Sequence, residues 1–330
     1  MKKLMLPLVL GAFMLLANLS TVAQTASVQI IHNAADPGAD PVDVYVNGTL
    51  LEDDFAFRDA TGILAVPAIG IPVNVGIAPG TSNTSGNGVM DTVKNFIFNL
   101  VAGQSYVVSA IGVIDDTNFD TGANANIELS AAVLSPAPTA ASAGNVNVAV
   151  LHGSTDAPAV DVLANGGMMP LIDDIAYGDY QGPTPVPATE YVFDVTLAND
   201  NSAVVASYYI DLSPVSGGSA VVFASGFLDP SMNQGGPAFG LFAALPDGTV
   251  LELDAVGNAR AQVIHNAADP NAVDVDIYIN WVKDSLKLDD FSFREATAFV
   301  DLPSGYPVKI GVALPNSTVS SEAIANFTAT

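Results

Sequence analysis

The three histidines of the chain each begin a copy of one short stretch that also carries aspartates. The first copy, residues 28–48, reads VQIIHNAADPGADPVDVYVNG. It returns at residues 261–280 as AQVIHNAADPNAVDVDIYIN, and a looser copy covers residues 148–166. Imidazole and carboxylate groups in one loop could bind a divalent cation or the hydroxyls of a glycan. The candidate binding residues are therefore His32, Asp36, Asp43, His152, Asp156, Asp161, His265, Asp269 and Asp276.

The same residues have a structural interpretation. A histidine that ends an apolar strand can hydrogen-bond a loop carbonyl, and an aspartate before proline commonly caps a turn. Repetition in every copy marks a requirement of the fold at least as well as it marks a site. We favour the structural interpretation and keep a binding role as the alternative.

Adjacent aspartates form a second candidate site. They occur as Asp53-Asp54, Asp173-Asp174 and Asp289-Asp290. In a regular strand neighbouring side chains point to opposite faces, so the two carboxylates of a pair could share an ion only in a turn. The sequence contains no EF-hand loop and no calcium-binding nonapeptide repeat. We therefore favour a role for the paired aspartates in turns. No cofactor is predicted, and calcium, with a modest stabilising effect, is the one ion considered.

Catalytic motifs are missing from the sequence. It has no cysteine, no G-x-S-x-G, no H-E-x-x-H, no phosphate-binding loop and no dinucleotide fingerprint. Each histidine belongs to a repeat, which argues against a single catalytic triad. We predict that the protein is not an enzyme and has no catalytic residues.

Composition indicates an all-β, acidic protein. Half of the 330 residues are hydrophobic and only 13% are charged, and the net charge is −25. Abundant valine, threonine, glycine, proline, asparagine and aspartate are typical of strands joined by tight turns. The negative charge repels nucleic acids and anionic membrane surfaces, which are therefore excluded as partners. An extracellular glycan or protein remains as a partner class.

The N-terminus has the pattern of a signal peptide. Lys2 and Lys3 precede an apolar run from Leu4 to Leu19, and small residues permit cleavage after Ala23. The run is short for a membrane anchor. We expect an exported protein, secreted or at the cell surface, with no membrane span after cleavage and a net charge of −27 once residues 1–23 are removed.

The repeats predict three tandem antiparallel β-sandwiches of the immunoglobulin-like kind. We expect a signal peptide at 1–23, modules at 26–134, 145–253 and 258–330, and a linker at 135–144. The histidines are 120 and 113 residues apart, and 65 residues follow His265. The third module is therefore expected to be incomplete. Either the sequence is a fragment or another strand completes the module, and we favour the fragment.

Several local features of the modules can also be predicted. Asn47-Gly48 is a hairpin signal, and the strands Val93–Leu100 and Tyr106–Val113 are expected to pair through a turn at residues 102–103. Trp281 replaces the hairpin glycine in the third copy, so it could stack on a ligand ring or cap a neighbouring module. Alternate phenylalanines are expected in the core: Phe55, Phe57, Phe291 and Phe293.

These motifs resemble the domain of unknown function family numbered 4397, which occurs in tandem in secreted bacterial proteins. The matching residues are His32, Asp36, Pro37, Val42, Asp43, Val44, Asn47 and Gly48; His152, Asp156, Pro158, Val160, Asp161, Val162, Asn165 and Gly166; and His265, Asp269, Pro270 and Asp276. The second copy departs most, with a shorter loop and Gly153 in place of Asn33. The resemblance implies a β-sandwich on a secreted or surface protein, and no established activity.

The composition also resembles exported proteins of the Bacteroidetes type, which carry a C-terminal sorting domain. Together the observations predict a non-catalytic, secreted or cell-surface scaffold with a structural, adhesive or binding role. Weak sites repeated along one chain would gain avidity. The alternative is the accessory binding part of an extracellular carbohydrate-active or hydrolytic enzyme.

Overall fold

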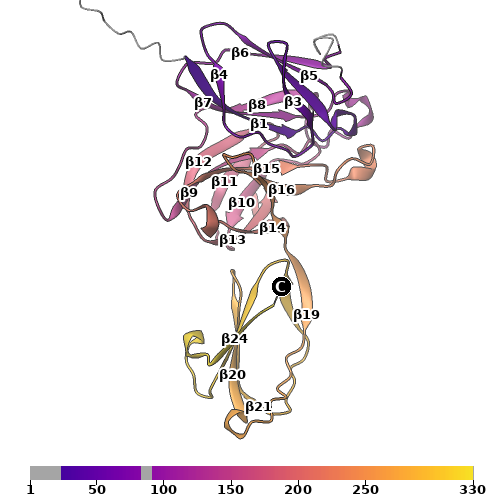
Figure 1. Cartoon of the computed structure of the whole chain (residues 1–330). Coiled ribbons are helices and arrows are strands. Elements are labelled where there is room, and N and C mark those ends of the chain that lie inside the picture. The colour runs from indigo at the N-terminus through magenta and orange to yellow at the C-terminus, as the bar shows by residue number, and fades with distance from the viewer. Residues whose placement is uncertain (1–23, 83–90, 330) are drawn as a thin grey trace, which may run out of the picture.

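The protein is built from β-strands, as the composition predicts. A computed structural model describes residues 24–82 and 91–329, so the predicted signal peptide lies outside the described residues. Strands make up 52% of the structure, and the described residues contain short 3-10 turns but no α-helix. None of their segments forms a helix able to cross a membrane. The predicted all-β class with β-sandwich modules is confirmed (Figure 1).

The first module consists of two four-stranded sheets. The strand order in one sheet is β4-β1-β7-β8 and in the other β3-β2-β5-β6. The first sheet comprises β1 (Thr25–Asn33), β4 (Leu64–Pro67), β7 (Ser105–Ile111) and β8 (Ser130–Leu134). The second comprises β2 (Val42–Val46), β3 (Thr49–Phe55), β5 (Val73–Pro79) and β6 (Lys94–Phe98). Short 3-10 turns η1 (Pro37–Ala39) and η3 (Asp116–Asn118) lie in the loops.

The second module repeats this arrangement with five strands in each sheet, ordered β12-β9-β15-β16-β17 and β11-β10-β13-β14-β18. The first sheet comprises β9 (Asn145–His152), β12 (Tyr180–Pro187), β15 (Ser219–Ser225), β16 (Gly240–Ala244) and β17 (Val250–Glu252). The second comprises β10 (Val160–Ala164), β11 (Pro170–Ile175), β13 (Glu190–Leu197), β14 (Asp200–Asp211) and β18 (Asp254–Ala255).

The third module has a two-stranded and a four-stranded sheet, ordered β19-β22 and β21-β20-β23-β24. The smaller sheet comprises β19 (Gly257–Ala261) and β22 (Val300–Ser304). The larger comprises β20 (Asp274–Asn280), β21 (Ser285–Ser292), β23 (Val308–Ala313) and β24 (Ala325–Ala329).

The connection after β6 differs from the prediction. β6 pairs with β5, whereas β7 pairs with β8 and, in parallel, with β1, so the two predicted partners lie in different sheets. The turn at residues 102–103, where Gly103 has a φ of 79°, therefore carries the chain from one sheet to the other. β15 repeats this parallel pairing with β9.

The Asn-Gly hairpins form as predicted. Asn47 and Gly48 have φ angles of 50° and 80°, and Asn165 and Gly166 have 53° and 71°. Two consecutive positive φ angles are the geometry of the turn that matches strand twist.

Phenylalanines contact the histidine in two modules. Phe55 and Phe291 are buried as predicted, whereas Phe57 and Phe293 are only half-buried. The half-buried rings approach the histidine ring of their own module edge-on, at centroid distances of 6.2 and 6.0 Å.

The first two modules share one apolar core. Buried Ile31 and Val107 of the first module pack in one cluster with Leu151 and Phe223 of the second. A hydrogen bond of 2.7 Å between the hydroxyls of Ser109 and Tyr180 crosses the same interface. In Figure 1 the sheet containing β1 accordingly faces the sheet containing β9. These two modules therefore pack as one unit.

Trp281 lies at the junction of the second and third modules. It is partly buried and packs in a cluster that contains Val192 and Tyr209 of the second module and Tyr306 of the third. The rings of Tyr209 and Tyr306 stack with centroids 5.1 Å apart. Trp281 therefore caps a neighbouring module, which is one of the two roles predicted for it.

Candidate functional site

Each predicted histidine is bound to a loop carbonyl of its own module. The Nε2 atoms of His32, His152 and His265 lie 2.7, 2.9 and 2.8 Å from the carbonyl oxygens of Ala39, Pro158 and Ala272. A carbonyl can only accept, so Nε2 carries the proton and donates it. The rings are 2%, 2% and 6% exposed. In the first two modules the bond connects the end of the first strand to the following loop, and in the third it connects His265, which follows β19, to the equivalent loop.

The surroundings of the three rings differ. Phe55 stacks on His32 at 6.0 Å and Phe291 on His265 at 6.3 Å, whereas Ile175 occupies this position beside His152. Burial lowers the pKa of His32 and of His152 below its ordinary value of 6.5, which favours their neutral forms at neutral pH.

The first aspartate of each copy binds backbone N–H groups. Asp36 accepts from Gly38 at 2.7 Å and from Ile114 at 2.8 Å. Asp156 accepts from the backbone of Leu228 and Asp229 at 2.9 and 3.0 Å. In both modules the carboxylate thus joins the histidine loop to the loop that follows the parallel strand.

In the third module the counterpart of Asp36 is Asp269, which accepts hydrogen bonds from its own loop. Asp269 accepts from the backbone N–H of Asn271 at 2.9 Å and from the Asn271 amide at 3.1 Å. It caps η6 (Pro270–Ala272), as Asp36 caps η1.

The second aspartate of each copy holds the paired-aspartate turn. The Oδ1 atoms of Asp43, Asp161 and Asp276 accept from the backbone N–H of the second aspartate in the pair, at 3.0, 2.6 and 2.8 Å. That second aspartate has a φ near 50° in every module: Asp54, Asp174 and Asp290. A left-handed residue here produces a bulge in the strand, which the buried carboxylate stabilises.

The nine candidate residues therefore lie near one end of each module, and each forms a hydrogen bond with a backbone group of its own module. Asp276 also accepts from the Ser317 hydroxyl and pairs with Lys287. Among residues 24–82 and 91–329, no three histidine, aspartate or glutamate side chains gather to hold a metal ion. These residues therefore offer no set of ligands for the calcium ion that was considered from the sequence.

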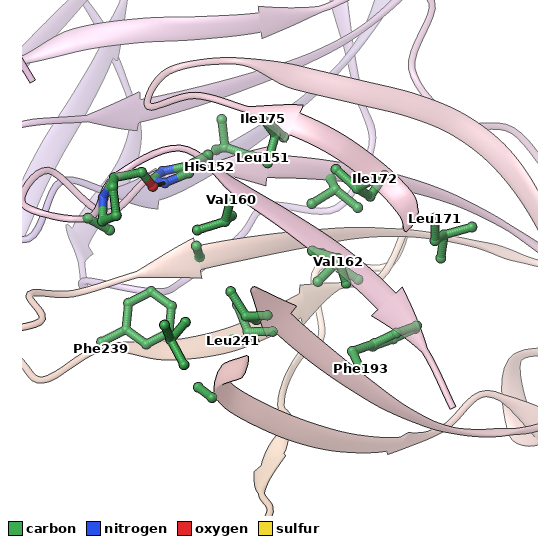
Figure 2. A pocket seen from close by; sticks show the side chains of 18 of the residues that line it. Leu151, His152, Val160, Val162, Leu171, Ile172, Ile175, Phe193, Phe239 and Leu241 are labelled. Carbon is green, nitrogen blue, oxygen red and sulfur yellow. Dashed lines mark hydrogen bonds between the residues drawn. The ribbon is translucent and has the colours of Figure 1, made fainter. Parts of the chain in front are cut away.

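The second module contains an apolar cavity between its two sheets (Figure 2). Its volume is about 200 Å³. Figure 2 shows His152 and Phe239 at one end and Leu171 and Phe193 at the other. Every other lining side chain is aliphatic or aromatic, apart from proline, and the inner wall includes Leu151, Val160, Val162, Ile172, Ile175 and Leu241.

The equivalent space in the first module is nearly filled. It is divided into cavities of about 40 and 20 Å³, and the smaller is lined by His32 and Phe55. Phe55 and Ile175 are equivalent because each pairs with the first residue of the preceding strand, Val42 or Val160. The ring that covers the histidine in the first module is therefore missing from the second.

One side of the cavity reaches the surface. Its lining residues Leu197, Val205 and Leu228 are 38%, 57% and 53% exposed. These three side chains form the mouth of the cavity.

The polar sequence motifs did not predict this cavity. The available signal was the third residue of the paired-aspartate motif, which is phenylalanine in the first and third copies and isoleucine at position 175. A missing ring at a core position predicts unfilled space.

Comparison with known proteins finds a family match within the second module. No curated protein matches the chain. A solved structure titled as alpha-glucan recognition by family 41 carbohydrate-binding modules from streptococcal virulence factors is 12% identical, with 60% of this chain and 92% of that chain covered. The TM-score of this match is 0.19. Residues 146–234, within the second module, match the family described as Domain of unknown function (DUF4397).

Proposed function

We propose that the protein is an exported, non-catalytic scaffold of tandem β-sandwich modules that binds a ligand without transforming it. The observation that carries this proposal is the histidine-to-carbonyl hydrogen bond, which occurs in the same position of all three modules. Because each histidine makes the same structural contact in its module, stabilisation of the fold is a sufficient role for these residues.

The buried rings are also poorly placed for catalysis on a polymer. A general base must come within hydrogen-bonding distance of the proton that it removes. The histidine rings are almost inaccessible, and the neighbouring carboxylates accept backbone hydrogens. These contacts favour structural roles for the residues whose chemistry first suggested a site.

The packing of the modules suits a scaffold. A continuous core joins the first and second modules, and Trp281 and Tyr306 pack on the second module from the third. Stiff connections keep binding surfaces at fixed separations, which raises the avidity of a multivalent interaction. The acidic composition favours an extracellular glycan or protein over a nucleic acid as the larger partner.

Incubation of the purified chain with soluble polysaccharides and peptides tests the absence of catalysis. Both retention of the polymer and release of products should be measured. We expect no product, and we expect His265→Gln to lower the thermal midpoint of unfolding without changing any retention by the folded fraction. Product release by the parent that disappears in a folded His265→Gln variant would contradict the proposal.

Export is tested by expressing the full chain in a bacterium and sequencing the N-terminus of the protein outside the cytoplasm. We expect a mature chain that begins near Gln24. Retention of Met1 and the apolar run in a cytoplasmic product would overturn this part of the proposal.

A further inference from the structure

We propose that the cavity of the second module is a binding site for a small, uncharged, largely hydrocarbon molecule. This inference rests on the proposed binding function and names the ligand class for one module.

The size and lining of the cavity define the ligand class. A buried apolar cavity of about 150 Å³ in another protein stays dry and binds benzene, so about 200 Å³ suits a molecule of about six to ten heavy atoms. A charged or strongly polar ligand would lose its hydration without finding partners. Short alkyl chains and single aromatic rings meet both conditions.

His152 is the one ionisable side chain in the lining. Its Nε2–H is already donated to Pro158, and Nδ1 is buried with no hydrogen-bond partner. Burial lowers its pKa, so the ring adds no positive charge at neutral pH. The cavity therefore lacks a cation that would select an anionic ligand.

The fold itself does not require the cavity. The first module has the same strands around two small cavities, and Phe55 covers its histidine. Unfilled space destabilises a core in proportion to its volume. A cavity confined to one of two equivalent modules, at a position where the other carries a larger side chain, is consistent with a site that a ligand fills.

The ligand has a route of entry. Leu197, Val205 and Leu228 are exposed at the mouth and continue the apolar lining to the surface. Exposed apolar groups that border a cavity are typical of binding sites.

Thermal unfolding and methyl NMR of the full chain test the proposal, with toluene and 1-hexanol as probes and glucose as the polar control. At ten times the dissociation constant we expect toluene or 1-hexanol to raise the midpoint by about 3–6 °C. We also expect saturable shifts of the methyl signals of Leu171, Ile175 and Leu241. Glucose should change neither measurement.

Two substitutions close the cavity, and one serves as their control. Ile175→Phe introduces the residue found in the first and third modules. Ala206→Phe adds a ring at a half-buried position of β14 that lines the cavity. Either folded variant should lose the toluene response. Phe55→Ile changes the equivalent position of the first module and should leave the response of the second module intact.

Three outcomes would overturn the inference: no saturable response of the parent chain, an equal response of a folded Ile175→Phe or Ala206→Phe variant, or loss of the response in Phe55→Ile alone. The polymer assay for catalysis uses none of these variants or probes, so failure here is distinguishable from failure of the scaffold proposal.

Discussion

The guanidinium carbon of Arg58 in the first module lies 4.0 Å from the ring centre of Phe242 in the second. The same side chain donates to the carbonyl of Ala238 at 2.6 Å and to the hydroxyl of Ser225 at 3.1 Å. A cation over an aromatic ring with directed hydrogen bonds is a specific contact. Arg58 therefore fixes how the first two modules pack.

Arg58→Ala should weaken this packing by about 3 kcal/mol, because it removes two hydrogen bonds and one partly buried cation–π contact, each worth about 1 kcal/mol. Arg294 is the matched control, because its backbone makes the equivalent bond to His265 while its exposed side chain lies over Phe293 of its own module. Urea unfolding should show a clear loss for Arg58→Ala and a much smaller one for Arg294→Ala. Equal losses would show that the contact with Phe242 contributes little.

The junction of the second and third modules has an ion pair with one buried member. The Nζ atom of Lys283 lies 2.7 Å from Oδ2 of Asp194, whose side chain is only 4% exposed. Lys283→Ala leaves a buried carboxylate without its cation and should cost about 2 kcal/mol. Lys309→Ala removes an exposed pair with Glu190 and should cost less than about 1 kcal/mol.

Trp281 fluorescence during urea unfolding reports on this junction, because Trp281 is the chain's only tryptophan and packs there. The Lys283→Ala transition should move to lower urea than the Lys309→Ala transition. A reversed order would show that the pair with Asp194 does not stabilise the junction.

Local sequence signals predicted the parts of the fold that local geometry determines. The Asn47-Gly48 turn needs a positive φ at both residues, and the Asn-Gly dipeptide alone predicts it. The parallel pairing of β1 with β7 was not predicted, because it joins residues about 80 positions apart and depends on the crossover at Gly103. Non-local pairing leaves no mark within a short window of sequence.

The interface and cavity could not be predicted for related reasons. Arg58, Gly178 and Arg294 occupy equivalent places, since each donates its backbone N–H to the histidine carbonyl of its module. The three-dimensional arrangement alone shows that the Arg58 side chain contacts a second module, whereas the Arg294 side chain lies over Phe293 of its own module. Likewise, Ile175 signals lost volume, but whether neighbours fill the space depends on both sheets.

The carboxylate of Asp161 stabilises a left-handed bulge. Its Oδ1 accepts from Asp174 N–H at 2.6 Å, and Asp174 has a φ of 50°. Asp161→Ala leaves this N–H without its acceptor and should cost about 1–3 kcal/mol. Asp161→Asn retains an acceptor oxygen and should cost less. Urea unfolding checks the order, and equal losses in the two variants would contradict the role of the acceptor.

Buried His32 and His152 should make stability depend on pH. Burial lowers the pKa of both below 6.5, so the unfolded chain binds more protons than the folded chain just below that value. Their contribution is present above pH 6.5 and is lost as the pH falls toward the folded pKa, by at most about 1.4 kcal/mol per histidine per pH unit. His152→Gln should reduce the slope of unfolding free energy between pH 7.5 and 5.5. An unchanged slope would contradict this prediction.

Asp276 should give the third module a separate acid-sensitive contribution. Burial alone would raise the pKa of this carboxyl group, but hydrogen bonds from Ser317, the backbone of Asp290 and Lys287 outweigh it and lower the pKa from 3.8 to about 2. Lys287 lies 3.1 Å away, and the Ser317 hydroxyl lies at 2.6 Å. The charged form is therefore favoured in the folded state, and its contribution is present above pH 3.8 and lost as the pH falls toward 2.

Asp276→Asn should remove this part of the acid dependence, and Lys287→Met should reduce it. Both variants can be compared with the parent by urea unfolding at several pH values between 4 and 2, with Trp281 fluorescence as the signal for the third module. Asp43→Asn is the matched control in the first module and should leave the Trp281 transition unchanged over this range. If Asp276→Asn keeps the full acid dependence of the parent, another carboxylate is responsible for it.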